Sequence, residues 1–309
     1  MFRTISTAIC ALVLSVTTAV ACDGRLIDDD RFFGAPLCVP ERPQRVVVLD
    51  QSFSLGIGME LGLPIIGAPL TRMSDENLLQ KAQDAGIEDL GFVTKPNLER
   101  IVALQPDLIV GFTGNPGLAE SVYPMLSSLA PTLLDVSGDW RGYYDVIGQL
   151  SGQEDKVAGL FEAYNARLEE VRAKVPDTKV SILRITSWDF QVYTDSPAAY
   201  APFDIVAEAG VLRSDFETAP DGPSLKRPDW EELAGLDGDI LLYIVGGTND
   251  SDVDGRHEEV IENPLWALLP AVRNDRVHRI DPATWMEFSG LISAHRVLDD
   301  IERLITDTP

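Results

Sequence analysis

The feature that most constrains the fold of this chain is a phrase that occurs twice. Residues 99–109 read ERIVALQPDLI and residues 231–241 read EELAGLDGDIL. In both, a glutamate precedes two apolar positions three apart, and an aspartate stands eight residues after the glutamate, just before an apolar strand. A helix that leads into a strand is typical of α/β folds, and its repetition predicts two lobes of similar topology.

Two further pairs of segments occur in the same order. Residues 45–50 (RVVVLD) and 179–184 (KVSILR) are apolar, β-branched runs that predict the first strand of a parallel sheet in each half. Strands predicted at residues 132–136 and 276–280 are each followed by a tryptophan. We therefore expect an α/β protein of two similar doubly wound lobes with a ligand cleft between them.

A helical segment separates the two halves. Residues 143–175 place apolar side chains at mostly helical spacing, which predicts one long helix or two abutting ones. Such a connection resists wide opening of the lobes. The predicted organisation is a signal peptide at 1–21, an N-terminal segment at 22–42, an N-lobe at 43–142, a linker helix at 143–175 and a C-lobe at 176–309.

The N-terminus predicts export. Arg3 precedes an uncharged apolar stretch at residues 5–16 and small residues up to Ala21, as in a secretory signal that is cleaved before Cys22. The stretch is too short for a membrane anchor. We expect a periplasmic protein that is soluble or tethered only at its N-terminus.

Two cysteines remain after this cleavage, Cys22 and Cys38. In an oxidising compartment their even number favours a disulfide. The alternative is a lipoprotein, because residues 19–22 (AVAC) also fit a lipobox that would place lipid on Cys22 and leave Cys38 unpaired. Two thiols this close to the terminus exclude an iron–sulfur cluster or a four-thiolate zinc site in the body of the protein.

The charge of the chain limits its partners. It has 49 acidic residues against 25 basic ones, so its surface repels nucleic acid and anionic lipid. It lacks a phosphate loop, the G-x-S-x-G and H-E-x-x-H motifs and a dinucleotide fingerprint. We expect a monomeric binding protein with no catalytic residues, metal ligands or cofactor, and an exported two-lobed enzyme is the distant alternative.

Five segments of the chain resemble the helical-backbone solute-binding proteins of ABC importers, which carry ferric siderophores, haem and cobalamin. They are RPQRVVVLD at 42–50, LGLPIIGAP at 61–69, PNLERIVALQPDLIVG at 96–111, NPLWALLPAVRNDRVHRID at 263–281 and ATWMEFSGLISAHRVLDDI at 283–301. The last two are similar to the siderophore branch, especially to ferric-hydroxamate binders. Val93 and Glu287 stand where those binders usually carry an arginine and a tyrosine.

The resemblance implies a protein that captures a ferric siderophore and delivers it to a permease in the inner membrane. Haem, cobalamin and ferric citrate are the alternative cargoes. The resemblance also implies that one glutamate on each lobe docks onto arginines of the permease, and Glu99 and Glu231 match these positions. Glu232 is the alternative in the second lobe, and an exposed residue near a helix start is the plainer interpretation of each.

The iron of a ferric siderophore is already saturated, so its binder needs aromatic walls and cationic donors rather than metal ligands. In doubly wound lobes these groups lie beyond the carboxyl ends of strands. The candidates at such places are Arg72, Lys95, Phe112, Trp140 and Arg141 in the N-lobe, and Arg184, Trp188 and Trp285 in the C-lobe.

Three of these candidates lead. Arg184 ends the run KVSILR, where an apolar residue is expected, and Arg72 is its leading partner from the other lobe. Trp285 matches a ligand-facing tryptophan of the family and is expected to form the apolar wall. For every basic candidate, the alternative is a solvated surface charge.

Overall fold

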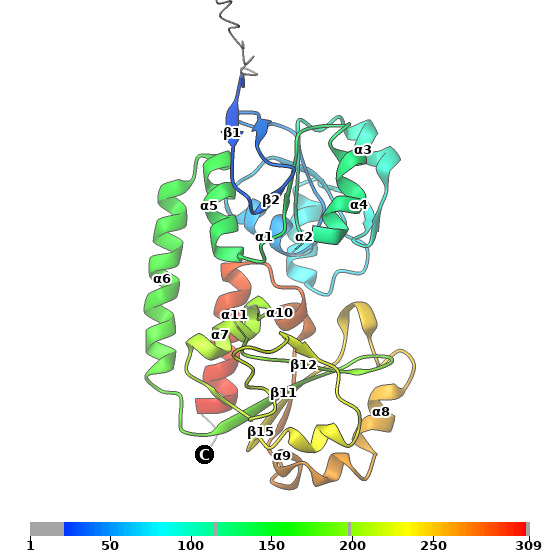
Figure 1. Cartoon of the computed structure of the whole chain (residues 1–309), viewed down its shortest axis with the longest axis vertical. Coiled ribbons are helices and arrows are strands. Elements are labelled where there is room, and N and C mark those ends of the chain that lie inside the picture. Colours follow the sequence, from blue (N-terminus) through cyan, green and yellow to red (C-terminus); the bar gives the residue numbers. More distant parts are fainter. Residues whose placement is uncertain (1–21, 114–115, 197–198, 307–309) are drawn as a thin grey trace, which may run out of the picture.

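The computed structural model describes residues 22–113, 116–196 and 199–306. The predicted signal peptide at residues 1–21 lies outside the described residues. Two lobes follow one another along the long axis of the molecule, and each is built on a six-stranded sheet (Figure 1). The predicted two-lobed α/β fold is confirmed.

The N-lobe sheet has the order β2-β10-β9-β4-β5-β6, in which only β2 is antiparallel. The parallel strands follow the doubly wound order, which reverses between β4 and β9. The strands are β2 (Phe32–Phe33), β4 (Val46–Val48), β5 (Ile65–Ala68), β6 (Glu88–Asp89), β9 (Leu108–Phe112) and β10 (Thr132–Asp135). The helices are α1 (Phe53–Glu60), α2 (Glu76–Asp84), α3 (Leu98–Leu104) and α4 (Pro116–Leu126).

The C-lobe sheet has the order β14-β12-β11-β15-β16, and β13 also pairs with β11. Strands β13, β15 and β16 run parallel to β11, whereas β12 turns back on β11 as a hairpin. The strands are β11 (Lys179–Ile185), β12 (Phe190–Tyr193), β13 (Leu212–Arg213), β14 (Leu225–Lys226), β15 (Ile240–Ile244) and β16 (Val277–Ile280). The α-helices are α7 (Ala201–Glu208), α8 (Arg256–Ile261), α9 (Pro270–Arg273), α10 (Pro282–Met286) and α11 (Leu291–Ile301).

The two repeated phrases occupy equivalent places in the lobes. β9 lies beside the first strand β4, and β15 lies beside the first strand β11, both in parallel. The preceding helices differ, because residues before β9 form α3 whereas those before β15 form only the 3-10 turn η1 (Glu232–Gly235). Gly235 and Gly238 in the second phrase lower its helix propensity.

Two helices, not one, connect the sheets. α5 (Trp140–Ser151) ends at Gly152, which adopts a left-handed conformation with a φ of 67°, and α6 (Glu154–Arg172) follows. α5 packs on α1 of the N-lobe, while α6 extends along both lobes and packs on α11 (Figure 1). Residues 143–175 therefore contain most of α5 and all of α6. Of these two helices, α6 is the one that passes from the N-lobe to the C-lobe.

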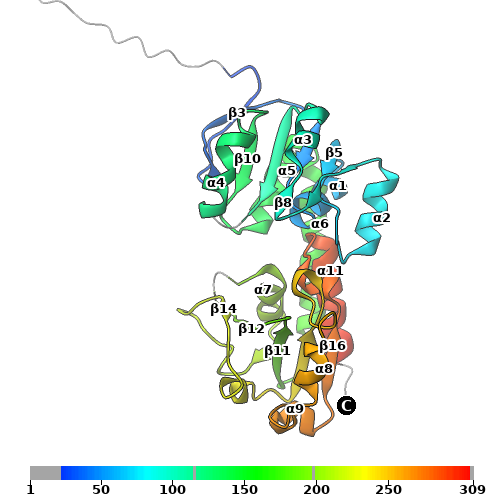
Figure 2. The ribbon, with the colours of Figure 1, turned by 90° about the vertical axis from the view of Figure 1, so that its right-hand side faces the viewer.

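The chain also returns to the N-lobe just before α11. The backbone N–H of Leu291 donates to the Tyr144 hydroxyl of α5 at 2.7 Å. One hydrophobic cluster includes both Val46 of β4 and Ile280 of β16. The lobes are thus joined by α6 and by contacts of the segment before α11, which lies beside α6 (Figure 2). Because the lobes share buried contacts, the fold favours a small rotation between them over wide opening.

Cys22 and Cys38 form a disulfide, with their Cα atoms 5.6 Å apart. It closes the antiparallel pair β1 (Arg25–Ile27) and β3 (Leu37–Val39), so the predicted disulfide is present. A sulfur in a disulfide cannot also carry lipid, and the two predicted states of Cys22 are therefore mutually exclusive. Across the described ranges, no helix has the length and apolar character needed to cross a membrane.

Candidate ligand-binding site

A cleft of about 910 Å³ lies between the two lobes. The N-lobe lines it with loops that follow β4, β9 and β10, and the C-lobe lines it with residues of β11, β12 and α7. The strand order reverses between β4 and β9 in the N-lobe and between β11 and β15 in the C-lobe, and residues at both points line the cleft. They are Asp50 after β4, Phe112 at the end of β9 and Arg184 on β11. Doubly wound sheets bind their ligands at such points.

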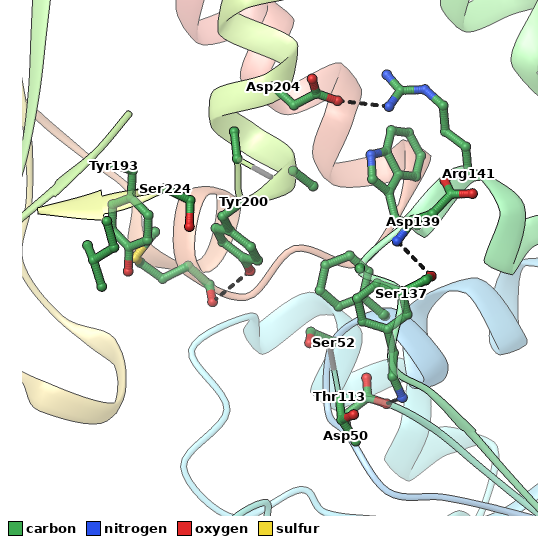
Figure 3. A pocket seen from close by; sticks show the side chains of 18 of the residues that line it. Asp50, Ser52, Thr113, Ser137, Asp139, Arg141, Tyr193, Tyr200, Asp204 and Ser224 are labelled. Carbon is green, nitrogen blue, oxygen red and sulfur yellow. Dashed lines mark hydrogen bonds and ion pairs between the residues drawn. The ribbon is translucent and has the colours of Figure 1, made fainter. Parts of the chain in front are cut away.

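Aromatic rings form much of the cleft wall. Phe53 and Phe112 stack in the N-lobe with their ring centroids 4.2 Å apart, and Trp140 lies at the start of α5. Tyr193 and Tyr200 face them from the C-lobe, as Figure 3 shows. These rings offer a flat, apolar and partly hydrogen-bonding surface to a bulky ligand.

Arg184 is the most unusual residue of the cleft. Its side chain is buried, and its guanidinium donates to Gln191 Oε1 and to the Gly246 carbonyl, each at 3.4 Å. Its Nε atom is buried without a hydrogen-bond partner, and no carboxylate of the described residues forms an ion pair with it. A buried charge is costly unless it is paired, so Arg184 is suited to receive an oxygen-rich group of a ligand.

Arg141 also lines the cleft, but it is already neutralised. Its guanidinium forms an ion pair with Asp204 at 2.9 Å, as Figure 3 shows. It forms a second one with Glu208 at 2.6 Å, and both carboxylates are on α7. It also lies 4.4 Å from the centroid of the Trp140 ring. Because α5 belongs to the N-lobe and α7 to the C-lobe, Arg141 joins the lobes at the edge of the cleft. Its charge is therefore less available to a ligand than that of Arg184.

Asp50 occupies the equivalent place in the N-lobe, and its hydrogen bonds are satisfied. Its carboxylate accepts from the Ser54 backbone N–H at 2.8 Å, from the Phe112 N–H at 2.9 Å and from the Ser54 hydroxyl. Burial raises the pKa of this carboxyl. The network ties β4, α1 and β9 together, so Asp50 supports the floor of the cleft.

Two predicted N-lobe residues lie outside the cleft. Arg72 is exposed, and its guanidinium lies 5.6 Å from the ring centroid of Phe92. Lys95 is exposed on β8 (Lys95–Pro96), which forms a short hairpin with β7 (Gly91–Phe92). Val93, in the turn of this hairpin, reaches the cleft instead. The predicted partnership of Arg72 with Arg184 therefore has no basis in this structure.

Two predicted C-lobe tryptophans also lie elsewhere. Trp188 is 61% exposed at the turn between β11 and β12, with the Arg227 guanidinium 4.9 Å from its ring centroid. Trp285 has no exposed surface, and its indole N–H donates to Asp300 at 2.8 Å. The prediction that Trp285 forms the ligand-facing wall is wrong for this structure, because α10 turns the ring into the C-lobe core.

The predicted residues that do line the cleft are Phe112, Trp140, Arg141 and Arg184. Sequence reasoning did not single out most of the others, which include Asp50, Ser52, Phe53, Ser137, Asp139, Tyr193, Tyr200, Asp204, Ser224 and Met286. Several follow strands directly, as Ser137 and Asp139 follow β10. Polar residues beyond strand ends therefore line the cleft as well as basic and aromatic ones.

Comparison with known proteins places the chain in a family. Its sequence matches the periplasmic binding protein family over residues 52–284. The chain belongs to this family. Members of the family bind ligands rather than catalyse reactions, so this periplasmic binding protein is not an enzyme.

Individual relatives are similar over most of their length. The chain is 30% identical over 273 residues to the achromobactin-binding periplasmic protein of Dickeya dadantii, covering 85% of this chain and 86% of the relative. It is 26% identical over 283 residues to the probable siderophore-binding lipoprotein YfiY of Bacillus subtilis, covering 87% and 85%. Like these relatives, this binding protein acts outside the cytoplasm.

Solved structures share the fold. Staphylococcus aureus SirA complexed with staphyloferrin B superposes with a TM-score of 0.73 at 22% identity, covering 86% of this chain and 94% of that one. At this identity the likeness concerns the arrangement of helices and strands, and it agrees with the two-lobed architecture described above.

Proposed function

We propose that this protein captures a ferric siderophore in the periplasm and delivers it to the permease of an ABC importer. The family and the relatives named above support an importer component, and two of those relatives carry a siderophore or a siderophore-binding role in their names. Ferric siderophores are bulky chelates with oxygen-rich surfaces. A large cleft with aromatic walls and a cationic donor suits them.

The single observation that carries this proposal is the position of Arg184. It is a buried guanidinium that lines a cleft of about 910 Å³ and has no ion-pair partner among the described residues. Acidic residues far outnumber basic ones in the chain, so the long-range field repels an anionic chelate. Attraction must therefore act at short range, where the guanidinium reaches chelate oxygens directly.

The proposal includes docking of one glutamate from each lobe onto the permease. Glu99 is exposed in the first turn of α3, and Glu231 is exposed directly before η1. Neither side chain lines the cleft. Both carboxylates are therefore accessible to arginines of a partner while the ligand is held between the lobes.

The proposal is tested by titrating the exported protein with a panel of ligands and following its tryptophan fluorescence. The panel contains ferric hydroxamates, ferric catecholates, ferric citrate, haemin and cobalamin. Trp140 lines the cleft and serves as the reporter. We expect saturable quenching by at least one ferric siderophore, and visible absorbance in protein purified with it. Binding of haemin, cobalamin or ferric citrate alone, or of no compound in the panel, would reject the proposal.

A further inference from the structure

A second, smaller chamber of about 160 Å³ adjoins the cleft. Ser52, Val93, Arg184 and Met286 line both spaces, so the two are adjacent and Arg184 faces each of them. A cavity of about 150 Å³ holds a molecule the size of benzene. The chamber is therefore too small for an iron chelate and large enough for one arm that extends from it.

The N-lobe contributes a buried amide to this chamber. Gln51 follows β4, at the point where the N-lobe strand order reverses, and only 6% of its surface is exposed. Its Oε1 atom is buried and has no hydrogen-bond partner among the described residues. A buried carbonyl oxygen without a donor is costly, so this atom is suited to accept from an N–H or O–H of the ligand arm.

The small chamber is lined by one cationic and one acidic side chain. Arg184 contributes a guanidinium, and Glu287 contributes a buried carboxylate that accepts from the backbone N–H and the hydroxyl of Ser74, each at 2.7 Å. An anionic arm would be repelled by Glu287, and a cationic arm would be repelled by Arg184. The chamber therefore favours a neutral group that both donates and accepts hydrogen bonds.

We infer that the small chamber is a subsite for a neutral amide arm of the ligand. The arm's carbonyl oxygen accepts from the Arg184 guanidinium, and its N–H donates to Gln51 Oε1. This inference rests on the proposed function, and it narrows the ligand to ferric chelates whose backbone carries uncoordinated amides. Gln51 is then a residue that determines specificity, whereas the aromatic walls and the remaining donors of Arg184 bind the chelate itself.

A matched pair of neutral chelates tests the inference. Ferrioxamine E is a macrocycle whose linkers between the hydroxamates carry secondary amides, and one such linker serves as the amide arm. Ferric tris(acetohydroxamate) presents the same iron coordination without linkers. We expect Gln51→Met to weaken ferrioxamine E about 3-fold to 10-fold, the scale of one hydrogen bond. The same variant should change the affinity for tris(acetohydroxamate), measured in excess acetohydroxamate, by less than about 2-fold.

Ser224→Ala is the matched control, because Ser224 lines only the larger cleft. It should change the affinities for both chelates by the same factor. Equal effects of Gln51→Met on the two chelates, or no effect on either, would overturn the inference. A structure of the unmodified protein with ferrioxamine E needs no variant, and it should place an amide within hydrogen-bonding reach of Gln51. An arm-free chamber in that complex would also overturn the inference.

The outcomes separate this inference from the proposed function. Binding of a ferric catecholate, with neither hydroxamate bound, would overturn the amide subsite and leave siderophore capture intact. Failure of every ferric chelate to bind would reject the proposed function itself.

Discussion

The N-lobe and the C-lobe each place one charged residue where their strand order reverses, but the surroundings of the two residues differ. Asp50 in the N-lobe accepts hydrogen bonds from Ser54 and Phe112 at normal distances. Among the residues that the structure describes, Arg184 in the C-lobe donates two long bonds and has a buried Nε without a partner. The same position in similar sheets thus carries a residue with satisfied hydrogen bonds in one lobe and, in the other, a buried guanidinium that we propose binds the ligand.

The largest expected effect tests whether the glutamates of the two lobes dock onto the permease together. The double variant Glu99→Arg, Glu231→Arg reverses one exposed charge on each lobe and should weaken association with the permease more than about 100-fold. Uptake of the ligand by cells should then be lost, while titration of the purified variant gives the native affinity. Normal uptake by cells that carry the double variant would show that these glutamates do not dock.

The next effect concerns Asp50. Asp50→Ala leaves the donors of Ser54 and Phe112 without their acceptor, so the free energy of unfolding should fall by about 2 to 4 kcal/mol. Urea denaturation measures this change. Asp139→Ala removes an exposed cap of α5 and is the control, with an expected loss of about 1 kcal/mol. If Asp50→Ala were no more destabilising than this control, the structural role of the N-lobe carboxylate would be disproved.

A smaller effect is expected at Arg141, which joins the lobes. Arg141→Met removes partly exposed ion pairs with Asp204 and Glu208, so the free energy of unfolding should fall by about 1 kcal/mol. The affinity for the ligand should change less than about 3-fold, because this guanidinium is already neutralised. A loss of affinity as large as that of an Arg184 variant would mean that the ligand displaces Asp204 and Glu208.

The smallest effect is a pH dependence at the contact between the lobes. Burial raises the pKa of Glu287, so the folded protein binds this proton more tightly than the unfolded chain does. The Glu287→Gln variant lacks this proton equilibrium. Relative to the variant, the free energy of unfolding of the native protein should therefore fall as pH rises from about 4.5 towards neutrality. Urea denaturation at several pH values tests this, and a constant or opposite difference would contradict it.

The sequence predicts the strands and the duplication well, because buried parallel strands must be apolar and the same helix-to-strand phrase occurs twice. It also predicts Arg184, whose charge interrupts an apolar run. It does not distinguish Trp140 from Trp285, which both follow the last parallel strand of their lobe. Trp140 begins a long helix at the edge of the cleft, whereas Trp285 lies in a short helix whose orientation depends on packing against α11.

Arg72 and Lys95 illustrate a second limit. Both are basic and lie near predicted strand ends, which is why the sequence favours them. In the structure, the short β7–β8 hairpin directs Val93 towards the cleft and leaves Lys95 exposed. Two-residue strands have no apolar pattern long enough to recognise in a sequence. The orientation of such a hairpin is decided by tertiary contacts, so the sequence alone could not place these side chains.

The most direct test of the account compares Arg184→Met with Arg72→Met in fluorescence titrations with the tightest ferric siderophore of the panel. Arg184→Met should weaken binding by about 1.5 to 3 kcal/mol, the usual contribution of a charged hydrogen bond, without loss of folding stability. Arg72→Met should bind as the native protein does, because Arg72 lies outside the cleft. Unchanged affinity in Arg184→Met, or equal losses in both variants, would contradict the claim that the ligand is held by the C-lobe guanidinium.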